Sequence, residues 1–126
     1  MKNITALSFV FICFFILQSC ENLGEQTIVS TVEELNKSIE SAEAGDHIVM
    51  ANGTWKDVAI KFQGEGTTEK RIVLRAETNG EVFIEGVSNF EISGKYLEVR
   101  GLFFRNGYSP TANIIAFRTS RKNVQY

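Results

Sequence analysis

Several residue types are scarce in this sequence, and each scarcity narrows what the protein can be. The two cysteines, Cys13 and Cys20, both lie near the amino terminus, so no disulfide can form within the chain that follows them. Proline is nearly absent, with only Pro110, and His47 is the only histidine. The net charge of -2 argues against a nucleic-acid-binding protein, which is normally basic. No Gly-rich phosphate loop, Cys/His metal pattern or serine nucleophile elbow is present.

The amino-terminal segment 1–19 has the pattern of an export signal. Lys2 gives a short positive start, and the following run Ile4–Leu17 is almost wholly apolar but too short for a comfortable transmembrane helix. The run ends in Leu-Gln-Ser-Cys, which resembles a bacterial lipobox, where a signal peptidase cuts before the cysteine and the thiol is lipidated. We therefore predict a lipoprotein signal peptide over 1–19 with the lipid on Cys20. The alternative is an ordinary signal peptide, with Cys20 incidental.

This signal predicts where the protein resides. We expect it to be secreted across the inner membrane and held by the lipid at Cys20, as a periplasmic, outer-membrane or cell-surface lipoprotein. Residues 20–29 are mostly polar at their start and are expected to form a tether. The folded domain is expected to cover 30–126.

One amphipathic helix is predicted at the start of this domain. Ser30 and Glu33 have the spacing of a capping box, and Gly45 is a suitable stop. The apolar residues that follow helical spacing are Val32, Leu35, Ile39 and Ala42. These signals predict a helix over Thr31–Ala44, which could cover the open edge of the strands that follow.

A short strand signal then recurs at a spacing of about 24 residues, at Ile48–Met50, Ile72–Leu74 and Tyr96–Val99. Within the period, Val58 follows Ile48 at the same sequence separation as Val82 follows Ile72. We predict an all-β fold, a right-handed parallel β-helix (a pectate-lyase-like solenoid) with an N-terminal capping helix, truncated within a repeat. An antiparallel meander or sandwich is the alternative, because Asn-Gly pairs are typical of hairpins. The expected strands are His47–Met50, Trp55–Phe62, Arg71–Ala76, Val82–Glu85, Phe90–Ile92 and Tyr96–Arg105, with a loop over Gly64–Lys70 and a further strand starting at Asn123.

The order of these motifs resembles a known family. After the helix come Gly45-Asp46 and a run from Asn52 to Val58, and the resemblance is strongest over Tyr96–Gly107. The chain from about Ser30 to Tyr126 is similar to family 6 of the polysaccharide lyases, which includes chondroitinase B and many alginate lyases. Residues Tyr108–Arg118 look more like the alginate-lyase branch.

The resemblance implies an enzyme that cleaves an anionic uronate polysaccharide, with alginate the expected substrate, by β-elimination. In the family a lysine acts as base, an arginine assists, and Ca²⁺ held by Asn and Glu side chains stabilises the developing charge. The resemblance puts these groups beyond Tyr126. We therefore expect Ca²⁺ in the full-length enzyme but no metal ligand and no catalytic residue in this segment, which by itself should be inactive.

Candidate substrate-binding residues within the chain are few. Arg118, Arg121 and Lys122 could contact an anionic sugar chain, although such a short basic cluster is more often a solvated loop. Trp55 and Tyr108 could stack on sugar rings, but Trp55 beside a turn is expected to be a partly buried residue of a coil. His47 is expected to be structural. The alternative function is a non-enzymatic β-helix lipoprotein that binds glycans at the surface, and a β-helix hydrolase or esterase would need paired carboxylates.

Overall fold

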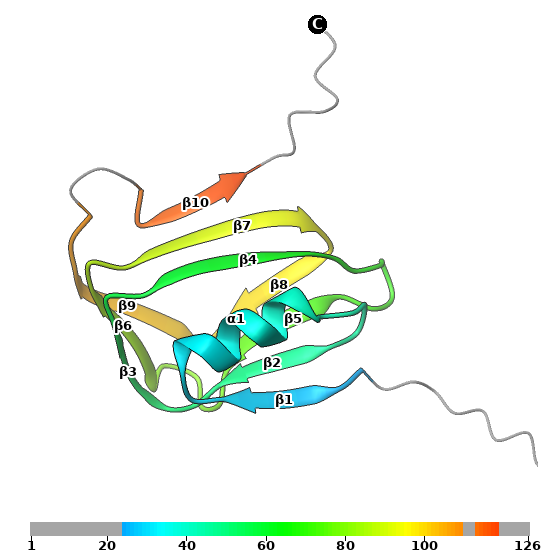
Figure 1. The fold of residues 1–126 in the computed structure, drawn as a ribbon, viewed down its shortest axis with the longest axis horizontal. Helices are drawn as coiled ribbons and strands as arrows, with labels where there is room; N and C mark the ends of the chain where they lie inside the picture. The colour runs from blue at the N-terminus through cyan, green and yellow to red at the C-terminus, as the bar shows by residue number, and fades with distance from the viewer. Residues whose placement is uncertain (1–23, 110–112, 119–126) are drawn as a thin grey trace, which may run out of the picture.

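A computed structural model describes residues 24–109 and 113–118 (Figure 1). The described part contains one helix and ten short strands. In chain order they are β1 (Gln26–Val29), α1 (Val32–Glu40), β2 (His47–Met50), β3 (Gly53–Lys56), β4 (Ala59–Glu65), β5 (Ile72–Ala76), β6 (Val82–Gly86), β7 (Asn89–Lys95), β8 (Leu97–Arg100), β9 (Leu102–Gly107) and β10 (Ile115–Arg118). None of the described helices is long and apolar enough to cross a membrane.

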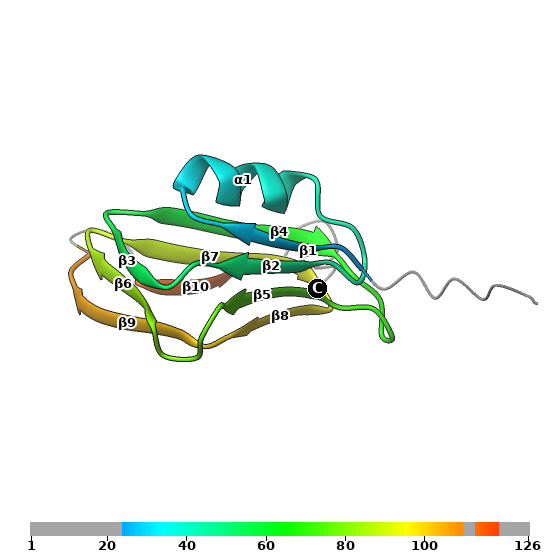
Figure 2. The ribbon, with the colours of Figure 1, turned by 90° about the horizontal axis from the view of Figure 1, so that it is seen from below.

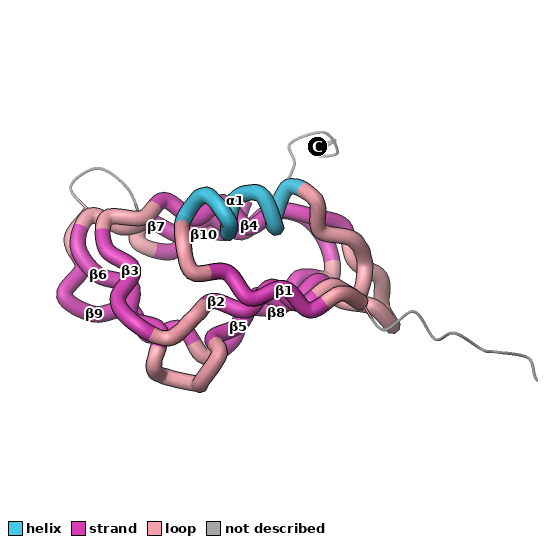
Figure 3. Tube along the Cα trace, turned by 60° about the horizontal axis from the view of Figure 1, so that its bottom comes forward, coloured by secondary structure: helices cyan, strands magenta, loops and turns pink. Residues whose placement is uncertain are grey.

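The strands form three parallel sheets, in the orders β1-β2-β5-β8, β3-β6-β9 and β4-β7-β10. Every strand pairing in the described part is parallel, and each coil of the chain adds one strand to each sheet in turn. Seen obliquely, the successive coils lie over one another around a common interior (Figure 3). The prediction of a parallel β-helix is confirmed, and the antiparallel alternative is wrong.

The interior is filled by the side chains that alternate inward along each strand. Phe62 and Phe90 are the largest fully buried side chains among the described residues. Around them lie the buried apolar residues Ile48, Met50, Ile60, Ile72, Leu74, Val82 and Ile84, which come from all three sheets. Burial of this apolar surface is the main force that holds the coils together.

Helix α1 covers the first coil, as the sequence predicts. It lies across one end of the stack, in contact with β1, β2 and β4 (Figure 2), and buries Leu35 and Ile39. Its capping box is one residue later than predicted: Glu34 N–H donates to Thr31 Oγ1 at 3.2 Å, and the Glu34 carboxylate accepts from the backbone N–H of Thr31 at 3.3 Å. The same carboxylate also accepts from the backbone N–H of Ser30 at 2.8 Å.

The helix also ends before the predicted Ala44. The Ser41 hydroxyl donates to the Lys37 carbonyl at 3.0 Å, and the Ser41 N–H bonds to the same carbonyl. The N–H bond is the regular bond of the last helical turn, and Ser41 is the C-cap residue at which the helix ends.

The expected tether over 20–29 is too long. Gln26–Val29 forms β1, which pairs with β2 from Gln26 beside His47 to Val29 beside Met50. Val29 is buried in the core. Hydrogen bonding to the edge of β2 and burial of Val29 make these residues part of the fold, so the ordered region begins before Ser30.

Two predicted strands are each divided by a bend. Trp55–Phe62 is β3 and β4, separated at Asp57, whose φ of 56° lets the chain turn from one sheet to the next. The Asp57 carboxylate accepts from the Val87 N–H of the next coil at 2.8 Å, which holds this bend. Tyr96–Arg105 is β8 and β9, separated at Gly101.

The strand over Phe90–Ile92 is longer than predicted, since β7 runs from Asn89 to Lys95 through Gly94. The predicted loop over Gly64–Lys70 begins later than expected, because β4 continues to Glu65 and pairs with β7 along its whole length. The strand expected at Asn123 lies outside the described residues.

The true repeat is slightly longer than the spacing predicted from the sequence, and it varies from coil to coil. Ile48 lies beside Leu74, and Leu74 lies beside Val99. The predicted equivalence of Val58 and Val82 is wrong, because Val82 pairs with Gly53. The loops at the bends differ in length between coils, so matching offsets in sequence do not mark matching positions in space.

Candidate functional site

Of the predicted basic cluster, the described residues include Arg118, at the end of β10. Its guanidinium lies 3.6 Å from the Glu91 carboxylate, and 64% of its side chain is exposed. It lines an open depression of about 530 Å³ beside the end of α1, with Ile39, Glu40 and Gly94. Arg121 and Lys122 lie outside the described residues, so the cluster itself stays a prediction.

The two candidate stacking residues occupy different environments. Trp55 is buried in the coil, and its Nε1–H donates to the Ala51 carbonyl at 3.1 Å. Trp55 is more deeply buried than the partly buried residue that the sequence predicts, and a ring buried in this way has no face open to a sugar. Tyr108 is 66% exposed and follows β9. It remains available for contact with a ligand.

The described residues contain no group of three or more His, Cys, Asp or Glu side chains that could hold a metal ion. His47 is the half-buried first residue of β2, and its backbone N–H donates to the Glu25 carbonyl at 2.8 Å. Asp46 uses its carboxylate to accept from the N–H groups of Glu25 and Glu43, at 2.9 and 2.8 Å. The Asp46 carboxylate thus holds the turn between α1 and β2.

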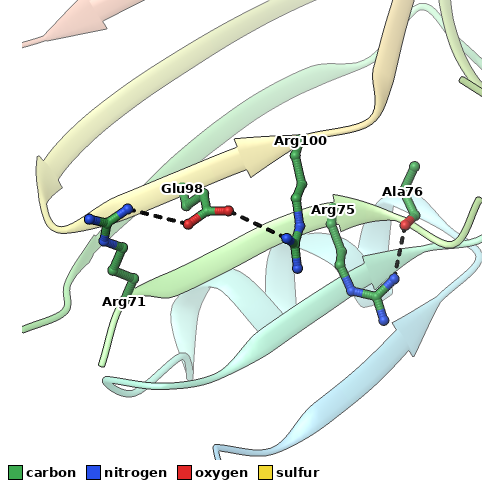
Figure 4. A network of polar contacts seen from close by, with 5 residues as sticks. All are labelled: Arg71, Arg75, Ala76, Glu98 and Arg100. Carbon is green, nitrogen blue, oxygen red and sulfur yellow. Dashed lines mark hydrogen bonds and ion pairs between the residues drawn. The ribbon is translucent and has the colours of Figure 1, made fainter. Parts of the chain in front are cut away.

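A set of charged side chains lies instead on the outer face of the sheet β1-β2-β5-β8 (Figure 4). Glu98 on β8 lies between two guanidinium groups, 3.5 Å from that of Arg71 and 3.7 Å from that of Arg100. Arg75 on β5 donates from Nη1 to the Ala76 carbonyl at 3.1 Å. More than half of each side chain is exposed for Arg71 and Arg100.

The parallel register places Arg75 directly beside Arg100. Neighbouring strands of a sheet are about 4.8 Å apart, so two side chains in register on the same face are held close together. Both arginines point outward because they alternate with Leu74 and Val99, which face the core. The backbone thus holds two positive charges side by side on an exposed face.

These two arginines border a recess of about 480 Å³, which is also lined by Glu77, Thr78 and Asn79. We call it the Arg75–Arg100 recess. It forms because the chain makes a loop over 77–81 between β5 and β6, whereas the next coil turns at Gly101 alone. The Gly80 N–H donates to the Gly101 carbonyl at 2.9 Å. Gly101 has φ +77°, and a Cβ there would press on Asn79.

Asn52 in the preceding coil holds the loop 77–81 beside this recess. Asn52 and Thr78 exchange two hydrogen bonds, from Asn52 Nδ2 to Thr78 Oγ1 at 2.9 Å and from Thr78 N–H to Asn52 Oδ1 at 3.0 Å. The Glu77 carboxylate accepts from the Asn52 N–H at 3.0 Å. The wall of the recess is therefore fixed before any ligand arrives.

Another cation lies on the sheet β3-β6-β9, where Arg105 stands 3.6 Å from the centre of the Phe83 ring. Its Nε also donates to the Glu85 carboxylate at 2.6 Å. Phe83 and Phe103 meet edge to face, with ring centres 6.2 Å apart. Arg105 already has an anionic and an aromatic partner, so this surface is less suited to bind an anion than the Arg75–Arg100 recess.

Several known proteins share this fold. The family model for chondroitinase B matches residues 29–126, most of the chain. The chain belongs to this family. Among solved structures, the family 6 alginate lyase AlyGC is 42% identical with a TM-score of 0.72 over 76% of this chain. The family 6 polysaccharide lyase Pedsa3628 from Pseudopedobacter saltans is 40% identical with a TM-score of 0.68 over 74%.

A mannuronic-acid-specific family 6 lyase from human gut microbiota is 24% identical over 77% of this chain, with a TM-score of 0.62, and supports the fold alone. The chain spans only 13% of AlyGC, 21% of Pedsa3628 and 25% of the gut enzyme. No curated protein matches it.

The repeat spacing predicted from the sequence does not pair the two arginines of the recess, although a sequence signal for the recess exists. The strand sequences Ile-Val-Leu-Arg and Leu-Glu-Val-Arg place an arginine at the fourth residue of both β5 and β8. The period predicted from the sequence sets Arg75 beside Val99, whereas the true register sets it beside Arg100. A shift of one residue in the strand register therefore decides whether the two arginines are neighbours.

Proposed function

We propose that the polypeptide carrying this chain is a polysaccharide lyase that cleaves an anionic uronate polymer, alginate, by β-elimination. The observation that carries the proposal is membership of the chondroitinase B family together with 42% identity to an alginate lyase over three quarters of the chain. The chain covers a small share of those enzymes, so the reaction is assigned to the whole polypeptide.

β-Elimination requires particular groups around the bound uronate. A base removes the C5 proton of a uronate, the electrons form a C4–C5 double bond, and the glycosidic oxygen on C4 leaves. The C5 proton is only weakly acidic, so a positive group must neutralise the adjacent carboxylate as charge develops. The described residues contain no group of three or more His, Cys, Asp or Glu side chains placed to hold a metal ion. The part that we propose for the described residues is to bind the polymer.

The products distinguish the candidate reactions. Digestion of alginate by the natural polypeptide should release oligosaccharides that are lighter by one water than hydrolysis products, because elimination adds no water. Mass spectrometry of the products measures this. Products with the mass of hydrolysis would assign the protein to a hydrolase. Binding without any cleavage would favour the alternative, a glycan-binding surface lipoprotein.

We also propose that Cys20 carries a lipid that attaches the protein to a membrane after export. The support is the apolar run that ends at a Ser-Cys pair, with Cys20 the last cysteine of the chain. Metabolic labelling with palmitate tests this, with Cys20→Ser and Cys13→Ser as matched variants. Cys13→Ser should keep the label and Cys20→Ser should lose it. A label retained by Cys20→Ser would contradict lipidation at this position.

A further inference from the structure

We propose that the Arg75–Arg100 recess is a subsite that binds the carboxylate of one uronate residue of the polymer. The inference rests on the proposed function for the identity of that polymer. It adds a binding position on the second and third coils, contributed by β5, β8 and the loop 77–81.

The charge of the two arginines favours an anion in the recess. Two arginines in register on neighbouring strands repel each other, and an anion between them relieves the repulsion. Glu98 offsets only part of this charge, because it is shared between Arg71 and Arg100 at the long distances of 3.5 and 3.7 Å. Exposed ion pairs of this kind contribute little, so Glu98 can be displaced by a better-placed anion.

The polar lining of the recess suits a charged sugar. Besides the two guanidinium groups, the recess presents Thr78 and Asn79, whose hydroxyl and amide groups suit the hydroxyls of a sugar. Glu77 also lines it but is engaged with the Asn52 N–H. The lining carries two positive charges and one negative charge, so a monoanionic sugar matches it better than a neutral one.

The residues of the recess are preorganised. The arginines stand on strands, and the loop is tied to the preceding coil through Asn52 and to the next coil through the Gly101 carbonyl. Little ordering is needed when a sugar binds, which favours affinity. A guanidinium also matches the planar carboxylate with two parallel hydrogen bonds. Arg105 already pairs with Glu85 at 2.6 Å and lies over the Phe83 ring. Arg118 has Ser93, and no second arginine, beside it on the neighbouring strand.

The test measures binding of saturated oligomannuronate and oligoguluronate to the natural polypeptide by calorimetry. Arg75→Gln and Arg100→Gln should each weaken binding about tenfold, the expected loss for a charge-assisted hydrogen bond of about 1.4 kcal/mol. KM on the polymer should rise while kcat is retained. Lys61→Gln, which removes a positive charge from the exposed face of β4, is the matched control and should bind as the wild type.

Glu98→Gln gives a change of the opposite sign. It removes the carboxylate that competes for Arg100, so it should bind the oligosaccharide several-fold more tightly. Oligosaccharides whose carboxyl groups have been reduced to alcohols should bind the wild type and both arginine variants equally. Melting temperatures close to that of the wild type establish that the variants fold.

The outcomes separate the two proposals. A wild type that cleaves alginate, with Arg75→Gln and Arg100→Gln that bind like the wild type, overturns the recess and leaves the lyase proposal standing. A Glu98→Gln variant that binds more weakly also overturns it. A wild type that neither binds nor cleaves any uronate polymer overturns the proposed function itself.

Discussion

Single residues with unusual backbone angles set where each coil can approach the next. Gly94 lies in β7 directly beside Gly64 in β4, and it has φ +127°. A Cβ on Gly94 would overlap the carbonyl oxygen of Gly64, which is part of a paired strand and cannot move aside. Only glycine fits here, because both its backbone angle and the space around it exclude a side chain.

We expect Gly94→Ala to lower the free energy of unfolding by roughly 2 kcal/mol more than Gly53→Ala does, an overpacking loss of the usual size. Gly53 is a matched control, with φ +130° and no atom within 4 Å of the position of a Cβ. Both variants therefore share the backbone strain of about 1–3 kcal/mol, and only Gly94→Ala adds a clash. Urea denaturation of the natural polypeptide measures the difference. Equal losses would show that the two coils do not approach as the structure has them.

Among single residues, those of the core were easier to predict from the sequence than those of the recess. Trp55 could be assigned to the interior because it follows a turn and begins an alternating pattern. Arg75 and Arg100 could not be paired, because their proximity depends on a strand register that is set by loop lengths. The bend at Asp57 was also missed, since a residue other than glycine with φ of 56° has little signal in sequence.

Among the elements, helix α1 has the predicted type of N-terminal cap, a capping box, but one residue later than predicted. Ser30 and Thr31 are both good N-cap residues, and each has a glutamate three positions later. Thr31 is the N-cap because β1 extends to Val29 and Ser30 links the strand to the helix. The position of the cap is thus decided by β1, which lies in the segment 20–29. That segment was expected to be a tether because its first residues are polar.

Thr31→Ala should therefore lower the free energy of unfolding by about 1 kcal/mol, the usual effect of losing an N-cap side chain. Ser30→Ala should change it by only a few tenths, because the contact of Ser30 with Glu34 uses its backbone N–H. Thermal or urea unfolding of the two variants side by side measures this. A larger loss for Ser30→Ala would move the cap back to the residue that the sequence first indicated.

On the scale of the whole molecule, recurrence of the strand signal was enough to predict a solenoid, because each coil must repeat an inward-facing apolar pattern to build a shared core. In the last described coil, side chains that face the core have no further described coil packed against them. Ile115 lies beside Phe90, and Phe117 lies beside Ile92, yet they are 46% and 78% exposed. In the described part of the chain this end is an apolar surface, unlike the end that α1 covers.

Residues 20–126 produced alone should therefore bind ANS or aggregate. Ile115→Ser combined with Phe117→Ser should reduce the ANS fluorescence, because these side chains contribute much of the exposed apolar surface at this end. Fluorescence titration and light scattering measure both effects. A monomer with a sharp, reversible melt and no ANS binding would show that this end does not need a cover.

The central claim is that the polypeptide carrying this chain is a uronate lyase. The most direct measurement is the ultraviolet absorbance of the unsaturated sugar ends that elimination creates, followed with alginate, chondroitin and dermatan sulfate as separate substrates. We predict that absorbance rises steadily on alginate and much less on the two sulfated polymers. No rise on any of the three polymers would contradict the assignment.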